Sequence, residues 1–189
     1  MPYLTTYDSP YGLLTLASEG QNLIGLWIEG QKYHGPTVAD NPHDLNGPKD
    51  HKDPKDLEVF KKTKKWLDRY FEGRKPRANE LPFLEPKGGI FRREVWGYLK
   101  EIPYGELTTY GAIAKKIAAK ANIAKMAAQA VGGAVGHNPI SIIIPCHRVV
   151  GQSGSLVGYG GGLDTKVKLL TFEGVDMTKL FRPKKGTAL

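Results

Sequence analysis

A run of three isoleucines closed by a proline constrains the fold of this chain more than any other feature. Ile142, Ile143 and Ile144 are typical of a short segment buried in a core. Pro145 fixes its own φ angle and lacks a backbone donor, so a regular strand or helix must break there. Cys146, the only cysteine in the chain, follows directly. We therefore expect one thiol to be held at a rigid break, at the edge of a core.

The thiol of Cys146 has two interpretations. A lone cysteine most often packs in a core as a small apolar residue. A thiol becomes a nucleophile only where its surroundings favour the thiolate. Here Pro145 precedes the cysteine, and His147 and Arg148 follow it. These neighbours favour a reactive thiol over a packing residue.

The composition is that of an ordinary folded protein without a membrane span. The chain has 189 residues, 40% of them hydrophobic and 24% charged, enough for one large domain or two small ones. No apolar run approaches the roughly 20 residues of a membrane span, and the first residues lack the basic and apolar regions of a signal peptide. One cysteine excludes an intrachain disulfide and fits a reducing compartment. We therefore expect a cytoplasmic protein.

Neither a metal nor a nucleotide cofactor is expected. The histidines are scattered, without the paired spacing of metal sites; they are His34, His43, His51, His137 and His147. The glycine-rich segment 151–162 lacks the Lys-Ser/Thr pair of a phosphate loop, and the GxGxxG spacing is absent. We expect this segment to be a flexible loop.

Positive charge is concentrated in the second half of the chain. Residues 1–88 contain 13 basic and 13 acidic residues, whereas residues 89–189 contain 14 basic and 6 acidic residues. The whole net charge of +8 therefore belongs to the half that carries Cys146. Such asymmetry points to an anionic partner, with nucleic acid as the leading candidate. A solvated basic surface kept for solubility fits the charge equally well.

The first half predicts a β-meander, a long loop and one helix. Short runs rich in aromatic, Thr and Leu/Ile residues indicate three strands, at Tyr3–Tyr7, Leu13–Ala17 and Leu23–Ile28. Residues 29–53 show no period and predict a long loop. A helix is expected from Asp56 to Phe71, with Gly73 as its stop. Its lysine run at 61–65 is interpreted as a solvated helix face.

The second half predicts a helix-turn-helix. Prolines and glycines at 74–89 mark a domain boundary, and a helix follows over Phe91–Ile102. Thr108 or Thr109 can cap a helix that carries Ile113 and Ile117 inward. A turn then leads to an Ala-rich helix at 123–135, and two such helices in a basic half indicate helix-turn-helix geometry.

The small residues of the second helix allow close approach to a surface. This favours recognition of DNA shape and backbone over base readout. Packing of the same face against another helix fits the pattern as well. Further on, Asp164 is expected to cap a helix at 165–172 that Gly174 ends, and residues 175–189 are expected to be frayed.

The motifs together resemble one family. P-C-H-R-V at 145–149 resembles the signature of the O6-alkylguanine-DNA alkyltransferases, also called methylated-DNA–protein-cysteine methyltransferases. The segments P-Y-G-E-x-x-T-Y ending at Tyr110, V-G-G-A-V-G-H-N-P at 131–139, the Tyr–Gly-Gly loop and L-L-x-x-E-G at 169–174 follow the family's order. The resemblance is strong over residues 90–175 and weaker before them.

The resemblance implies a fold in two domains. Residues 1–88 are expected to form an α/β N-terminal domain that is ribonuclease-H-like and contains the β-meander. Residues 89–175 are expected to form a mainly α, winged-helix-like domain with the helix-turn-helix, for DNA binding and alkyl transfer. Residues 176–189 are expected to be a basic tail.

The family's activity is DNA repair by a single-use protein. The resemblance implies transfer of a methyl or other alkyl group from O6-alkylguanine, and from O4-alkylthymine, to Cys146. The duplex is bound through its minor groove and the damaged nucleotide is flipped out. The thioether product has no good leaving group, so each molecule acts once. A monomer that requires no cofactor or metal is implied.

Roles are implied for five catalytic residues and for a set of binding residues. Cys146 is the nucleophile, His147 its base through a water molecule, and Glu173 orients the histidine. Tyr110 donates a proton to the departing guanine, and Asn138 ties the recognition helix to the cysteine segment. DNA and substrate contacts are expected from Tyr110, Gly111, Lys125, Gln129, Gln152, Tyr159 and Gly160. Arg148 is expected to be structural or to face a phosphate.

The chain departs from the family pattern at two of these positions. Gln129 stands where many members have an arginine that is inserted into the base stack, and we expect Gln129 to act as the wedge with Lys125 adding charge. Gly160 stands where some members have a serine, which leaves the backbone amides of 159–161 to contact the guanine oxygen. A thiol hydrolase and a non-catalytic lesion-binding relative are the alternatives.

Overall fold

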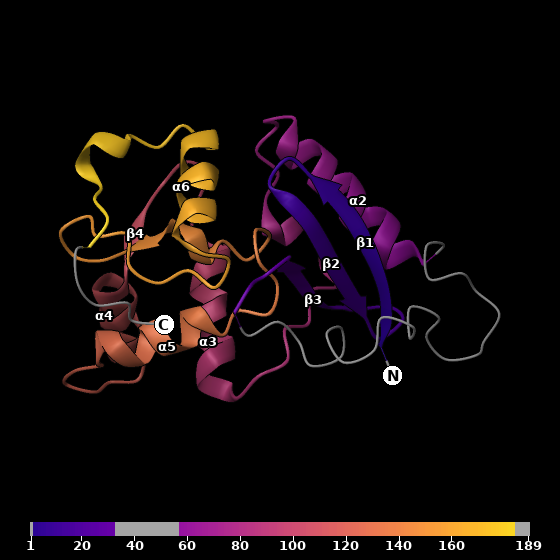
Figure 1. Ribbon diagram of the computed structural model, residues 1–189. Coiled ribbons are helices and arrows are strands. Elements are labelled where there is room, and N and C mark those ends of the chain that lie inside the picture. The colour runs from indigo at the N-terminus through magenta and orange to yellow at the C-terminus, as the bar shows by residue number, and fades with distance from the viewer. Residues whose placement is uncertain (1, 33–56, 184–189) are drawn as a thin grey trace. The chain divides into compact units, whose positions relative to one another are not determined.

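The structure is a computed structural model that describes residues 2–32 and 57–183 (Figure 1). It divides into two compact units. The N-terminal unit comprises the chain up to Lys87 together with the segment Pro139–Ile143. The C-terminal unit comprises Gly88–Asn138 and the chain from Ile144 onward. The predicted loop at 29–53 lies, from residue 33, outside the described residues, as do 184–189.

The N-terminal unit is built on an antiparallel sheet of order β1-β2-β3. The strands are β1 (Tyr3–Ser9), β2 (Gly12–Ser18) and β3 (Leu23–Ile28), which confirms the predicted meander. Large apolar side chains and tight turns of Gly, Asn and Ser favour this arrangement. Ile140 adds a parallel bridge to Leu26, so the segment before the cysteine extends the edge of this sheet.

One helix, α2 (Glu58–Phe71), packs in the same unit, as predicted. Its buried face recurs with helical spacing and comprises Val59, Phe60, Thr63, Trp66, Leu67 and Tyr70. Lys61, Lys62 and Lys65 are exposed, as a solvated face requires, whereas Lys64 is half-buried and donates to the Thr5 hydroxyl at 3.1 Å. Gly73, with φ of +75°, ends the helix in the left-handed conformation that favours glycine. A short 3₁₀ turn, η3 (Ala78–Glu80), follows.

The C-terminal unit is mainly helical. Its elements in chain order are α3 (Ile90–Lys100), β4 (Thr108–Thr109), α4 (Tyr110–Lys120), α5 (Ala128–Gly136), η4 (Cys146–Arg148), β5 (Val149–Val150), α6 (Leu163–Phe172) and η5 (Met177–Lys179). β4 and β5 pair in parallel. The buried indole of Trp96 donates to the carbonyl oxygen of Ala134 at 2.8 Å and joins α3 to α5. Among the described residues no helix is long and apolar enough to cross a membrane.

The second helix of the predicted pair begins five residues later than expected. Asn122 adopts φ of +52°, and Ile123 donates its amide to the carbonyl oxygen of Ala118. This is the hydrogen-bond pattern that closes a helix C-terminus, so Ile123 belongs to the cap of α4. The predicted start of a helix at residue 123 is therefore wrong, and α5 begins at Ala128.

Two further expectations about the C-terminal region are corrected. Asp164 does not cap α6, because the helix begins at Leu163 and Asp164 lies in its first turn. The region after residue 175 is not frayed as far as Pro183: η5 forms there, and the amide of Leu156 donates to the carbonyl oxygen of Phe181 at 2.9 Å. This pairing with the glycine-rich segment supplies backbone partners that the sequence pattern does not reveal.

Replacement of Thr109 by alanine tests the local cap that starts α4. The Thr109 hydroxyl accepts from the amide of Ala112 at 3.1 Å, which confirms the predicted cap. Thr109→Ala leaves that amide without its partner and should lower the free energy of unfolding by about 1 kcal/mol. Urea denaturation measures the change, and Thr109→Ser, which keeps the hydroxyl, should remain close to the original stability. Equal losses in both variants would contradict the cap.

Candidate active site

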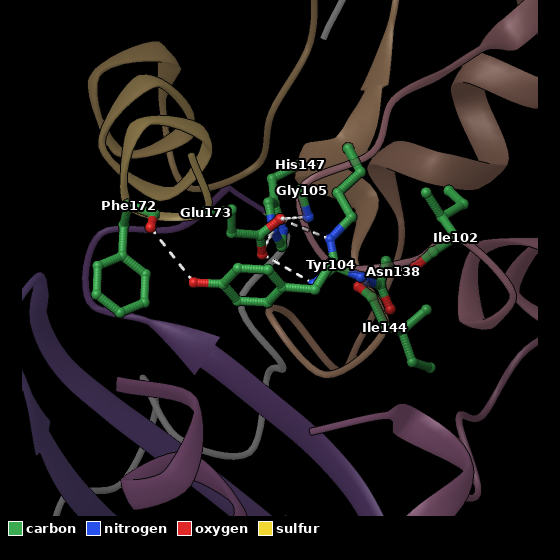
Figure 2. Close-up of polar contacts among 9 residues, drawn as sticks. Ile102, Tyr104, Gly105, Asn138, Ile144, His147, Phe172 and Glu173 are labelled. Atoms are coloured by element: carbon green, nitrogen blue, oxygen red, sulfur yellow. Dashed lines mark hydrogen bonds and ion pairs between the residues drawn. The ribbon is translucent and has the colours of Figure 1, made fainter. Parts of the chain in front are cut away.

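Cys146 lies at the start of a 3₁₀ turn rather than in a strand. Pro145, with φ of −82° and ψ of 66°, is the centre of a three-residue turn in which the Cys146 amide donates to the Ile144 carbonyl oxygen at 2.8 Å. The predicted break at Pro145 is thus confirmed. Asn138 Nδ2 donates to the Ile144 carbonyl oxygen at 2.7 Å (Figure 2). It also donates to Cys146 Sγ at 3.1 Å, so the two sequence-predicted residues meet.

The thiol of Cys146 is 5% exposed and is held between opposing electrostatic influences. Burial raises the pKa of Cys146 above its ordinary value. The hydrogen bond from Asn138, the charge of Lys166 and the backbone amides of residues 146 and 147 act in the other direction. The thiol is therefore protonated at neutral pH until a base removes its proton, while donors that favour the thiolate are already in place.

His147 is the base nearest to the thiol in the sequence. Its ring is fully buried, and Nε2 lies 2.8 Å from Oε1 of Glu173. Burial lowers the pKa of His147, although Glu173 opposes this change. A neutral ring that donates from Nε2 to the carboxylate has Nδ1 as its acceptor. Nδ1 has no hydrogen-bond partner among the described residues.

The carboxylate of Glu173 is the centre of the polar cluster that Figure 2 shows. Arg148 donates from Nε to Oε2 and from Nη2 to Oε1, both at 2.8 Å, and from Nη1 to the Ile102 carbonyl oxygen at 2.7 Å. Burial acts against ionisation, but the hydrogen bonds from His147 and Arg148 prevail and lower the pKa of Glu173. Since Arg148 is itself buried, it is structural, and a role facing a phosphate is excluded.

Two backbone features place Glu173 in this cluster. Glu173 is the C-cap of α6, and Gly174, with φ of +78°, closes the helix behind it. The amide of Gly105 donates to Oε2 at 3.2 Å. A Cβ atom at position 105 would lie 2.9 Å from the carbonyl oxygen of Glu173, so only glycine fits.

Tyr110 opens α4 and points its hydroxyl at the glycine-rich loop. The hydroxyl donates to the carbonyl oxygens of Val157 at 2.9 Å and Gly158 at 3.3 Å. Burial, followed by proximity to Cys146, raises the pKa of Tyr110. The phenol therefore keeps its proton at neutral pH. These hydrogen bonds tie the glycine-rich loop, which was expected to be flexible, to the start of α4.

Lys166 is a site residue that the sequence reasoning missed. Its side chain is fully buried, and Nζ donates to the carbonyl oxygens of Val149 at 2.6 Å and Val157 at 3.1 Å. Burial lowers the pKa of Lys166 to about 8, while Cys146 acts in the opposite direction. The available signal was its spacing, because Lys166 stands three and four residues before the buried Leu169 and Leu170 on one face of α6.

Of the other predicted contact residues, Tyr159 meets this polar cluster, and the rest lie on α4, before or in α5, and on the glycine-rich loop. Gln129 is exposed on the first turn of α5, and Lys125 is exposed just before that helix. Gly111 lies at the start of α4, and Gln152 is exposed on the loop. Tyr159 is buried, and its ring meets that of His147 edge to face with the centroids 6.3 Å apart; Gly160, beside it, is half-buried.

Comparison with known proteins gives the same assignment for both halves of the chain. A family model described as "6-O-methylguanine DNA methyltransferase, DNA binding domain" matches residues 90–175. A second, described as "6-O-methylguanine DNA methyltransferase, ribonuclease-like domain", matches residues 3–84.

Individual relatives match over most of their length. The methylated-DNA–protein-cysteine methyltransferase of Haemophilus influenzae is 44% identical over 171 residues, covering 90% of this chain and 86% of the relative. The crystal structure of the Mycobacterium tuberculosis O6-methylguanine methyltransferase covers 92% of this chain and 93% of its own, with 39% identity and a TM-score of 0.69. A structure of the Mycobacterium tuberculosis protein in complex with DNA gives 40% identity, a TM-score of 0.69 and coverage of 90% and 92%. With both halves matched, this chain belongs to the 6-O-methylguanine DNA methyltransferase family.

Proposed function

We propose that this chain is a DNA repair protein that moves a methyl group from O6-methylguanine in DNA to Cys146. The observation that carries the proposal is the buried thiol, held by Asn138 beside the His147–Glu173 pair. Family membership supports the substrate, and a relative solved with DNA supports the partner. O4-alkylthymine is proposed as a second substrate because it presents the same kind of alkylated ring oxygen.

The transfer is a displacement in which the atoms balance. Nδ1 of His147 takes the thiol proton through a water molecule, and Sγ attacks the methyl carbon. The S–C bond forms as the C–O6 bond breaks, and the electron pair leaves with guanine. Tyr110 donates a proton to the departing base, so guanine is restored in neutral form, and the remaining tyrosinate recovers a proton from the His147 imidazolium. Asn138 and Lys166 favour the thiolate while it exists.

The product explains why the protein acts once. A methyl thioether has no good leaving group, and no proton transfer within the cluster converts it back to a thiol. A reducing compartment suits a free thiol of this kind, so we propose a cytoplasmic location. We further propose that the protein acts as a monomer.

DNA access is proposed through the minor groove. α4 and α5 form the helix-turn-helix, and α5 carries exposed Ala128, Gln129 and Ala130, with half-buried Gly132 and Gly133 on the next turn. Small side chains let the helix backbone approach the groove closely. The damaged base must leave the stack to reach a buried thiol, at a cost of a few kcal/mol.

For the fold, we propose a ribonuclease-H-like N-terminal domain and a winged-helix-like C-terminal domain.

Mass spectrometry of the protein after incubation with methylated DNA tests the proposed reaction. A duplex oligonucleotide with one O6-methylguanine should add a single methyl group, permanently, to Cys146, with one equivalent consumed per protein. Cys146→Ala should abolish transfer and still bind the oligonucleotide, because the helix-turn-helix is intact. Turnover beyond one equivalent would favour a thiol hydrolase, and binding without transfer by the unaltered protein would favour a lesion-binding relative.

Replacement of Glu173 by glutamine tests the charge at the centre of the cluster. Glu173→Gln leaves the Arg148 charge buried without its partner and should lower the free energy of unfolding by about 3–5 kcal/mol at pH 7. Because the folded-state pKa of Glu173 is lowered, this advantage of the original protein is present above the ordinary carboxyl pKa and is lost as pH falls below about 4.5.

Urea denaturation over a pH series measures both effects. Glu80→Gln is the matched control, because the Arg69–Glu80 ion pair has side chains that are 38% and 37% exposed. That exposed pair should contribute less than about 1 kcal/mol. A loss for Glu173→Gln no larger than the control, or one that does not change with pH, contradicts the buried carboxylate.

Replacement of Gln129 by alanine tests the wedge. If Gln129 holds the space of the flipped nucleotide, Gln129→Ala should slow transfer from duplex DNA and leave transfer from the free base O6-methylguanine unchanged. Lys125→Ala is the comparison, since removal of a charge should weaken DNA binding and reduce its salt dependence. Transfer from duplex DNA as fast as in the unaltered protein would show that Gln129 is not the wedge.

A further inference from the structure

A strained residue lies four positions before the reactive cysteine. Ile142 adopts φ of +69°, in a region that is a genuine outlier for a β-branched side chain. The amide of Ile143 donates to the carbonyl oxygen of Ser141 at 2.8 Å, which closes a three-residue turn around Ile142. A γ-turn with a positive central φ is rare and strained. Such strain persists only where the surroundings hold it in place.

The sheet of the N-terminal unit holds one end of this turn. The amide of Ser141 donates to the carbonyl oxygen of Leu26 at 2.8 Å, and its hydroxyl donates to Oε1 of Gln31 at 2.8 Å. The same Oε1 accepts from the amide of Ile28 at 3.2 Å. Ser141, Gln31 and Ile142 are all buried. Ser141, the first residue of the strained turn, is therefore fixed by both its backbone and its side chain.

The other end of the turn leads to the thiol within a few bonds. Two residues, Ile143 and Ile144, lie between Ile142, the centre of the first turn, and Pro145, the centre of the inverse γ-turn. Asn138 then contacts both the Ile144 carbonyl oxygen and Sγ of Cys146. The covalent path from Ile142 to the Asn138–Cys146 contact is therefore short.

We propose that Ile142 is a positioning residue for the transfer reaction: its left-handed backbone, anchored by the Ser141–Gln31 hydrogen bond, directs Cys146 toward Asn138. The inference rests on the proposed function. If the strained turn at Ile142 served only to connect two elements, releasing the strain would not change the reactivity of the Cys146 thiol. The proposal therefore has one thermodynamic consequence and one kinetic consequence.

Matched truncations at two neighbouring positions test the strain. Ile142 and Ile143 are 1% and 2% exposed, and only Ile142 has a positive φ. Alanine and glycine variants at each position remove the same buried side chain. Glycine is normally less favourable than alanine, but the order reverses where φ is positive. The melting temperature of Ile142→Gly should exceed that of Ile142→Ala, whereas Ile143→Gly should melt below Ile143→Ala. If the glycine variant melts below the alanine variant at both positions, the backbone of Ile142 is not strained.

Single-turnover kinetics with an O6-methylguanine duplex tests the positioning. Ile142→Gly frees the backbone, so its limiting transfer rate constant should fall about 10- to 100-fold, with the dissociation constant for the duplex unchanged. Ile143→Gly should lose much less. Equal rate constants for the two glycine variants overturn the inference alone, whereas a wild-type protein that takes up no methyl group overturns the proposed function.

A second pair of variants leaves the isoleucine core intact. Ser141→Ala removes the anchor and should slow transfer without weakening DNA binding. Ser18→Ala, at another fully buried serine whose hydroxyl has no partner among the described residues, should not. In an Asn138→Ala background, Ile142→Gly should add little further loss, because both changes disrupt one contact. Unchanged transfer by Ser141→Ala, or additive losses with Asn138→Ala, would falsify the proposed path.

Discussion

The buried carboxylate of Glu173 is the interaction on which the rest of the site depends. A buried charge is very costly unless it is paired and its oxygens receive hydrogen bonds. Glu173 satisfies both conditions, because Arg148 donates two hydrogen bonds, His147 one and the amide of Gly105 one. With the positive charge supplied by Arg148, the histidine can remain neutral. A neutral His147 that donates to the carboxylate presents Nδ1 as a base.

Three motifs that are far apart in the sequence therefore meet at the Glu173 carboxylate. Gly105 comes from the P-Y-G-E segment, Arg148 from P-C-H-R-V, and Glu173 from the closing E-G. Each supplies a donor or the acceptor itself, and the two glycines, at 105 and 174, give the backbone the conformations that the cluster needs. The Arg148–Glu173 ion pair also links α3 to α6, because Arg148 donates to the carbonyl oxygen of Ile102, just after α3, and Glu173 is the C-cap of α6.

The elements of the fold were more predictable than the contacts of the site. Periodicity and turn residues were sufficient for the meander, α2 and α3, because these depend on local patterns. The start of α5 was missed, because Ile123 caps the preceding helix through a backbone bond that its side chain does not signal. Lys166 was missed because a charged residue on an apolar face is normally exposed at its tip. The partners that permit its burial are carbonyl oxygens, which no sequence pattern marks.

The resemblance assigned roles to Cys146 and His147, and the backbone explains how adjacent residues can share one reaction. In a strand their side chains would point to opposite faces. The inverse γ-turn at Pro145 and the 3₁₀ turn that follows remove this alternation. Pro145 allows the inverse γ-turn to be predicted from the sequence, whereas an isoleucine gives no indication of the left-handed turn at Ile142. A conformation against local preference must be imposed by distant hydrogen bonds, and here these come from β3 and Gln31.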